Sequence, residues 1–311
     1  MLTGPDYQLP NPDHLDPDRK HAYVFAHQDD ELGSGGTIAR TAWKHGNFLW
    51  VTNGDGLAPM EGVDPQAYSA VRMAEAKLSA GHCGIPPERI SDLEVSEIEW
   101  YRSFSHVAEG GVRREDALKF SRDVYDRVHS WLEQTEPDVV WTGAWQCQHP
   151  EHDLTHFFVA HALKDLRRKW RRPVPLYEFP EYEFVILVPL RFKPWHKGVV
   201  HRVRLTDADV ANKMLLYAAY PSQAALFDKF ERVIRRLGLA AGLVGRSFSI
   251  EEFMRHEEFG PVPEDRDFRA DRHLHPFLDY MLDDFEGIPI SFRTMIRPIV
   301  EDIETRRPVT G

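Results

Sequence analysis

A run of acidic residues follows directly after a short apolar segment near the start of the chain. Residues 25–36 read FAHQDDELGSGG, so His27 is followed closely by Asp29, Asp30 and Glu31. Neighbouring carboxylates repel one another, and their charges are costly to place beside a hydrophobic core. We therefore expect a positive group near this loop. A divalent cation would serve, because it stabilises carboxylates around it.

A second group of potential metal ligands lies in residues 143–156, GAWQCQHPEHDLTH. It contributes several histidines, among them His149 and His152. Two histidines and one aspartate that meet at one place are a donor set for zinc, with open positions left for water and substrate. In such a site Asp30 binds the metal, and Asp29 beside it is left to act as a base.

The apolar pattern predicts the elements that must bring these residues together. Ala22–Ala26 is continuously apolar, as is typical of a strand buried on both faces. The expected strands are 22–26, 48–51, 90–95, 139–141 and one near 176, and the expected helices are 34–45, 66–82, 117–131 and 154–170. This alternation predicts an α/β fold, with a Rossmann-like, mostly parallel sheet and helices on both faces.

Ligands in such sheets bind just beyond the carboxyl ends of the strands. The acidic loop follows the first of these strands and the histidine cluster follows the fourth, so both should lie at the same edge. Taken alone, His27 is also explained as an ordinary histidine at a strand end, and the acids as caps of a helix N-terminus, where negative charge is favourable. The expected meeting of the two stretches favours the metal site.

Beyond residue 190 the pattern changes. A strand is expected at 199–205 and helices at 207–217 and 224–238, and the tail from about residue 245 is rich in charge, proline and aromatic residues. We expect an irregular N-terminal arm at 1–20, a core domain at 21–225, and a C-terminal helical extension at 226–311 that packs on the core. That tail shapes either the mouth of the pocket or an interface, or it only covers the sheet edge.

Composition limits the classes of binding partner and the cellular compartment that we expect for the protein. The chain has 311 residues and a net charge of −11, which argues against a general affinity for nucleic acid or anionic membranes. The basic run Arg167–Arg172 is the exception, and it is either a solvated helix end or an anion site. With two cysteines, no apolar signal region at the N-terminus and no apolar run long enough to span a bilayer, we expect a cytoplasmic protein.

Two motifs resemble those of a known family. His27–Glu31 resembles the His-Pro-Asp-Asp-Glu motif of the LmbE / PIG-L family of zinc-dependent N-deacetylases, and His149–His152 resembles its His-Pro-Asp-His motif. The resemblance covers about residues 21–225, which would form the catalytic domain. Weaker matches follow in the expected order at Thr52–Gly54, Arg72–Glu75 and Tyr220–Gln223.

The resemblance implies a metal site and a base. One zinc ion per chain, with another divalent metal left open, would bind to His27, Asp30 and His152. Asp29 would be the general base that acts on a zinc-activated water.

The resemblance also implies roles around the substrate. His149 would stabilise the oxyanion and act as a general acid, and Glu151 would orient His149. Arg72 would face the substrate. Two departures from the family pattern, Gln28 for proline and Glu151 for aspartate, remove neither a metal ligand nor the base, so we expect an active enzyme.

The expected activity is that of a metal-dependent hydrolase. It would remove an acetyl or other acyl group from the amide nitrogen of an N-acetylglucosamine-type substrate, either a small N-acetylated sugar or a glycoconjugate. The aromatic residues that could stack on a sugar ring are Trp100, Tyr101, Trp145 and Trp195. The sequence leaves the acyl group, the acceptor and a homo-oligomeric state open.

Three other interpretations stay open. The first is an amidase that acts on a non-sugar N-acyl compound, and the second is a non-catalytic sugar-binding relative. The third is a Rossmann-like nucleotide-binding protein that holds phosphate at Gly33–Gly36, although the Gly-x-Gly-x-x-Gly fingerprint is missing. His156, four residues after His152, is expected to pack in the core or behind the site, and Cys147 is a weaker candidate for a metal or catalytic role.

Overall fold

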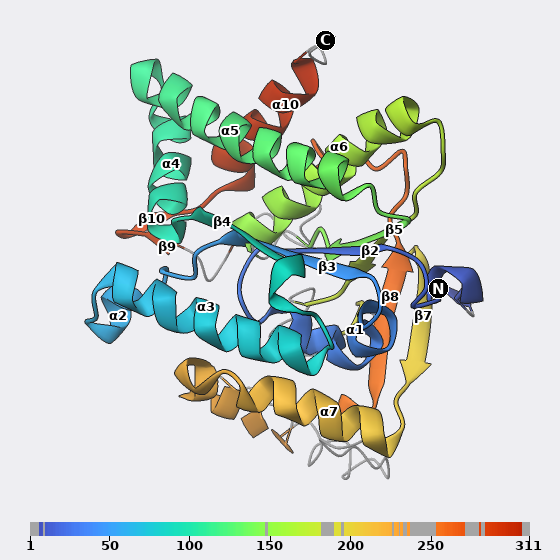
Figure 1. Cartoon of the computed structure of the whole chain (residues 1–311). Coiled ribbons are helices and arrows are strands. Elements are labelled where there is room, and N and C mark those ends of the chain that lie inside the picture. The colour runs from blue at the N-terminus through green and yellow to red at the C-terminus, as the bar shows by residue number, and fades with distance from the viewer. Residues whose placement is uncertain are drawn as a thin grey trace.

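An eight-stranded sheet forms the middle layer of the protein (Figure 1). The computed structural model describes residues 6–8, 10–146, 149–181, 190–193, 196–225, 227–229, 231–232, 235–236, 253–270, 280 and 284–306. The strand order is β1-β7-β8-β6-β5-β2-β3-β4. The strands are β1 Asp6–Tyr7, β2 His21–Phe25, β3 Gly46–Thr52, β4 Ile90–Val95, β5 Val139–Gly143, β6 Leu176–Phe179, β7 Val199–Arg204 and β8 His256–Pro261.

Five neighbouring strands, β6, β5, β2, β3 and β4, run parallel. β8 is antiparallel to both β6 and β7, and β1 runs parallel to β7. A separate hairpin pairs β9 Asp284–Phe285 with β10 Ile288–Pro289. The structure therefore confirms the expected α/β fold with a mostly parallel sheet.

Helices cover both faces of the sheet (Figure 1). They are α1 Gly35–Ala42, α2 Ala58–Glu61, α3 Pro65–His82, α4 Glu97–Glu109, α5 Gly111–Thr135, α6 Pro150–Trp170, α7 Asp207–Ala218 and α10 Arg297–Thr305. α4, α5, α6 and α10 share one hydrophobic core with the sheet, and α1, α3 and α7 share another. Alternate residues of β2 face the two cores, since Val24 belongs to the first and Phe25 to the second, which explains why this strand is apolar throughout.

Some boundaries differ from the sequence expectation. The expected helix at 34–45 is the shorter α1, which follows a 3₁₀ turn at Asp30–Ser34. Gly46, directly after the expected helix, begins β3. The apolar stripe at 117–131 belongs to the longer α5, and the helix expected at 224–238 lies partly outside the described residues.

The region beyond residue 225, which we expected to be a helical extension, also supplies a strand of the main sheet. β8 lies between β6 and β7, so this region completes the sheet as well as adding α10. Glu257 on β8 accepts hydrogen bonds from the backbone N–H groups of Gly36 and Thr37 at the start of α1. It also accepts from Nζ of the buried Lys213, at 2.6 Å. The tail therefore fixes the helix that follows the acidic loop.

Among the described residues, no helix combines the length and the apolar character needed to cross a membrane.

Candidate active site

The acidic loop and the histidine cluster meet at one edge of the sheet, as the strand pattern predicts. The loop follows β2, and His149 precedes α6, which follows β5. β2 and β5 are parallel neighbours, so their carboxyl ends lie side by side. His152 lies in the first turn of α6 and is buried.

The three residues expected to bind metal lie in contact distance of one another. Nδ1 of His27 is 2.9 Å from Nε2 of His152. Oδ1 of Asp30 is 3.8 Å from the first of these nitrogens and 3.5 Å from the second. Two imidazoles and one carboxylate that converge in this way fit the donor set of a catalytic zinc site.

The backbone of the loop is held in an uncommon conformation. The N–H of His27 donates to Oδ2 of Asp30 at 2.8 Å, which closes the loop on itself. Asp29, between them, has a φ of 118°, in the left-handed region that non-glycine residues rarely adopt. Such strain persists where the surroundings enforce it, and it is concentrated at functional sites.

Asp29 forms an ion pair with a buried arginine. Nη2 of Arg72 on α3 lies 3.2 Å from Oδ1 of Asp29, and the arginine also donates to the backbone carbonyl of Gln28. Burial raises the pKa of Asp29, Arg72 opposes that rise, and Asp30 adds to it. The family resemblance implies that Arg72 faces the substrate; in the structure its closest contacts are Asp29 and the Gln28 carbonyl.

The third acid of the run has neutral partners. Oε1 of Glu31 accepts hydrogen bonds from Ser79 Oγ at 2.5 Å and from Tyr220 OH at 2.6 Å. Burial raises the pKa of Glu31 to about 7, although these hydrogen bonds lower it. Asp29, Asp30 and Glu31 therefore each have a different set of partners. The hydrogen-bond donors to Oε1 of Glu31 are neutral hydroxyl groups.

Glu151 contacts a different histidine from the one expected. Its Oε2 lies 2.8 Å from Nε2 of His27 and 3.6 Å from Nδ1 of His149. The shorter contact is therefore the one to the expected metal ligand.

His149 is the most exposed of the three clustered histidines. Its ring centroid lies 4.8 Å from those of both His27 and His152, and its side chain is 24% exposed. Burial and the neighbouring histidines lower the pKa of His149 well below its ordinary value. A neutral imidazole that is partly open to solvent can donate a hydrogen bond to a developing oxyanion.

Two further glutamates belong to the site, and the sequence motifs do not include them. Oε2 of Glu181 lies 2.5 Å from Nδ1 of His152, and Oε2 of Glu97 lies 3.8 Å from Nε2 of His27. Glu181 lies just after β6 and Glu97 just after β4. The strand-end rule that located the acidic loop could have found both.

The charges around the site raise two pKa values. Burial opposes protonation of His27, yet the carboxylates of Glu97 and Glu151 raise its pKa well above the ordinary value. Burial also raises the pKa of Glu181 well above that of an ordinary glutamate, and Asp30 adds to this. A dense set of buried acids and imidazoles is the environment that a divalent cation stabilises.

His156 lies behind the site, as expected. Its Nδ1 donates to the carbonyl oxygen of Gly143 at 2.8 Å, and Arg266 donates to its Nε2 at 3.1 Å. Arg266 also holds Glu178 through two hydrogen bonds of 2.6 Å. Burial and Arg266 lower the pKa of His156 to about 4. The other weak candidate, Cys147, lies outside the described residues.

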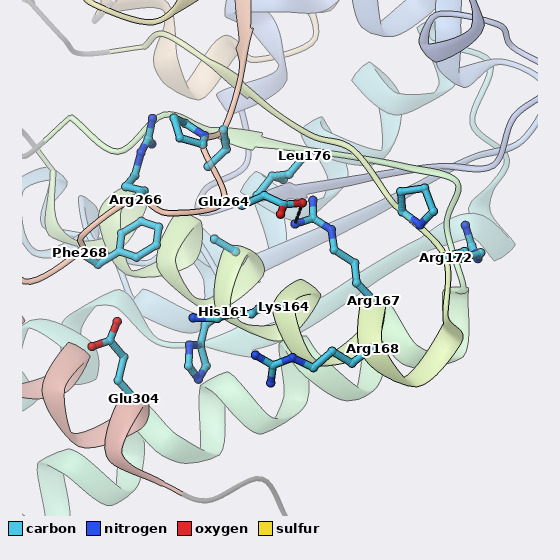
Figure 2. A pocket seen from close by; sticks show the side chains of 14 residues that line it. His161, Lys164, Arg167, Arg168, Arg172, Leu176, Glu264, Arg266, Phe268 and Glu304 are labelled. Atoms are coloured by element: carbon cyan, nitrogen blue, oxygen red, sulfur yellow. Dashed lines mark hydrogen bonds and ion pairs between the residues drawn. The ribbon is translucent and has the colours of Figure 1, made fainter.

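The basic run lies elsewhere, around the second half of α6. A pocket of about 430 Å³ lies there, and none of the expected site residues lines it. Its lining side chains include Lys164, Arg167 and Arg168 (Figure 2). Arg167 donates to the carbonyl oxygen of Val174 and pairs with Glu264, and Arg168 pairs with Asp165. Because these basic side chains already have partners within the protein, the contacts favour an ordinary solvated helix end. They argue against a dedicated anion-binding site.

The aromatic candidates for sugar stacking differ in position. Trp100 and Trp145 are buried in the core. Tyr101 is half-buried, and its ring centroid lies 6.3 Å from that of His149. Trp195 lies outside the described residues.

Comparison with known proteins identifies a family domain in this region. Residues 22–163 match the family described as PIG-L, GlcNAc-PI de-N-acetylase. No curated protein matches the sequence significantly.

Several solved deacetylase structures share the fold. A deacetylase from the teicoplanin biosynthesis pathway is 16% identical, with a TM-score of 0.56 over 78% of this chain and 98% of its own. The A40926 pseudoaglycone deacetylase is 14% identical, with a TM-score of 0.55 over 81% of this chain and 100% of its own. The zinc-inhibited form of teicoplanin deacetylase is 15% identical, with a TM-score of 0.50 over 78% of this chain and 98% of its own.

Proposed function

Because residues 22–163 form a PIG-L (LmbE-like) family domain, we propose that the protein is a metal-dependent N-deacetylase. One observation carries the proposal. Donor atoms of His27, Asp30 and His152 lie within 3.8 Å of one another at the carboxyl ends of β2 and β5, and Asp29 lies beside them in the same loop. This arrangement supplies a metal site and an adjacent base.

His27, Asp30 and His152 would hold the metal. Zinc suits two imidazoles and one carboxylate. A divalent cation there supplies Lewis-acid chemistry, which polarises an amide carbonyl and makes water easier to deprotonate.

Two other residues of the site would transfer a proton or stabilise negative charge. Asp29, in its ionised form, takes a proton from the attacking water. His149 donates a hydrogen bond to the carbonyl oxygen as negative charge develops on it. The amide C–N bond then breaks, a proton passes to the leaving nitrogen, and the products are an amine and a carboxylic acid.

The substrate would be an N-acetylated amino sugar or a glycoconjugate that carries one. The matched family is described by a GlcNAc-containing substrate, and two similar structures are a deacetylase of the teicoplanin biosynthesis pathway and the A40926 pseudoaglycone deacetylase. Tyr101 next to His149 offers an aromatic ring for a sugar face.

The catalytic domain would span 21–225, and two cysteines in 311 residues suit a reducing, cytoplasmic setting.

An assay of product release tests this proposal. Purified protein is stripped with a chelator, reloaded with one equivalent of zinc, and incubated with N-acetylglucosamine, GlcNAc-bearing lipid and glycopeptide, and a non-sugar N-acyl amine. We expect free amine and acetate from a GlcNAc compound, no release after stripping, and recovery on reloading. Release from the non-sugar compound alone would support the amidase interpretation, and no release from a folded, zinc-loaded protein would contradict the proposal for these substrates.

A further inference from the structure

We propose that Gln28 is a positioning residue for Asp29, the proposed base. Its side chain fixes the peptide group between residues 28 and 29, and through that group the place of the Asp29 carboxylate. This inference rests on the proposed function and goes beyond it, because it gives a role to the residue that stands where the family motif has proline.

The side chain of Gln28 reaches the end of the neighbouring strand. It is fully buried, and its Nε2 donates to the backbone carbonyl oxygen of Thr52, the last residue of β3, at 2.7 Å. The opposite orientation of the amide would bring two acceptors together, so Nε2 must be the atom at Thr52. Within the described part of the chain, Oε1 of this amide has no hydrogen-bond partner. The bond to Thr52 can therefore be removed without breaking another hydrogen bond of the same side chain.

Thr52 is itself a fixed anchor. Its backbone N–H and its Oγ1 both donate to the carbonyl oxygen of Ala26, at 2.9 and 2.8 Å, and its side chain is buried. Ala26 directly precedes the acidic loop. The hydrogen bond from Gln28 therefore ties the start of this loop to the end of β3.

The peptide group that follows Gln28 is also held at both of its polar atoms. Arg72 donates to the carbonyl oxygen of Gln28, and the N–H of Asp29 donates to Oε2 of Glu31 at 3.3 Å. The orientation of this group sets the φ angle of Asp29, because φ describes rotation about the bond from its nitrogen to Cα of Asp29. A φ of 118° is costly for an aspartate, so it persists only where contacts enforce it. The contacts of Gln28 supply part of that restraint.

The strained angle determines where the base lies. A general base must come within about 2.6 to 3.2 Å of the atom that it deprotonates. If the restraint is lost and φ relaxes toward the common negative range, the carboxylate of Asp29 moves away from its present place beside Asp30. Loss of the Gln28 contact should therefore slow the chemical step and leave the proposed metal ligands in position.

A glycine makes room for the amide. A Cβ atom at Gly54 would lie 2.5 Å from Oε1 of Gln28 and 3.0 Å from Cβ of Arg72, and the φ of 76° also favours glycine there. Gly54→Ala should therefore push the amide away from Thr52. Gly62 is a control for the backbone angle alone, since its φ is 66° and no described atom lies within 4 Å of a Cβ added to it.

Steady-state kinetics of the zinc-loaded protein test the proposal, with the N-acetylglucosamine compound that the wild type cleaves fastest. Gln28→Met removes the donor and keeps a side chain of similar length. We expect kcat to fall by about 10- to 100-fold, as displacement of a catalytic group does. KM should stay close to the wild-type value, and the variant should still hold one zinc per chain.

Asn212 on α7 provides the matched control. Its Nδ2 donates to the carbonyl oxygen of His82, the last residue of α3, at 3.1 Å, and none of the expected site residues takes part in this contact. Asn212→Leu removes the same kind of hydrogen bond. It should lower stability in urea unfolding, as Gln28→Met does, and leave kcat unchanged.

The glycine variants preserve the test if Gln28→Met fails to fold. Gly54→Ala should lower kcat more than Gly62→Ala does. In the double variant Gln28→Ala/Gly54→Ala, the loss of kcat should be smaller than the product of the two single losses, because both substitutions act on one contact. A loss equal to that product would overturn the proposal.

The outcomes separate this inference from the proposed function. If the wild-type protein releases no amine, the proposed function fails and the inference fails with it. If the wild type is active, but Gln28→Met keeps its kcat or loses zinc in proportion to activity, the proposed function stands and the positioning role is wrong. Equal losses of kcat in Gln28→Met and Asn212→Leu would show a structural role only, and would also overturn the proposal.

Discussion

The guanidinium of Arg72 lies 3.2 Å from the carboxylate of Asp29, and this ion pair joins α3 to the acidic loop after β2. Arg72 is 5% exposed and Asp29 is 19% exposed at the side chain, so the carboxylate faces solvent more than its partner does. The pair therefore holds the proposed base at the site without covering it.

Asp29→Asn should separate metal binding from turnover. The amide cannot accept the proton of water, so we expect kcat to fall by about 10²- to 10⁴-fold while zinc content stays at the wild-type level. Asp30→Asn is the control, and it should lose zinc together with activity. An Asp29→Asn enzyme that turns over at the normal rate would show that another group is the base.

Arg72→Gln should move the acid limb of the pH–rate profile. Burial raises the pKa of Asp29 and Arg72 lowers it, so removing the cation should raise this pKa further. The base must be ionised to work, and the acid limb of kcat/KM should therefore shift to higher pH. Arg102→Gln, at an exposed ion pair with Glu99, should leave the profile in place; a profile unchanged in Arg72→Gln would contradict the coupling.

Glu31→Gln should change how stability depends on pH. The pKa of Glu31 is about 7 in the fold against 4.5 for an unperturbed side chain, so its contribution to stability is complete below pH 4.5 and is lost as the pH rises through 7. The total loss is on the order of 3 kcal/mol. Glutamine does not ionise, so the difference in Tm between variant and wild type should become more favourable to the variant from pH 5 to pH 8. A difference that is constant with pH would refute the assignment.

Glu257→Gln should destabilise the whole fold. The variant leaves the ammonium of Lys213 buried without its carboxylate and weakens the contacts at the start of α1. Breaking a buried pair in this way costs about 3 to 5 kcal/mol, as urea unfolding would measure. The matched control is Glu109→Gln at the exposed pair with Arg113, which should cost at most about 1 kcal/mol. Equal effects of the two substitutions would show that β8 does not anchor α1.

Much of the fold was predictable because its signals are local. The parallel strands are short apolar runs, and the rule that ligands bind at strand ends placed His27, Asp30 and His152 together. β8 was missed because His256–Pro261 reads HEEFGP and is not apolar. Its buried Glu257 is compatible with the sheet because Lys213 and the start of α1, both distant in the sequence, form hydrogen bonds with it.

The contacts between residues of the site were harder to predict than the residues that form it. Glu181 and Glu97 belong to no motif, and each reaches a histidine that comes from another strand end. The choice of Glu151 between His27 and His149 depends on differences of less than 1 Å, which spacing along the chain does not determine.

Metal content of the purified protein tests the central claim most directly. Elemental mass spectrometry should find about one zinc per chain in the wild type and in His45→Ala, an exposed control at the opposite end of β3. Zinc should be lost in His152→Ala. A folded wild-type protein that holds no metal and takes up none when zinc is added would contradict the account.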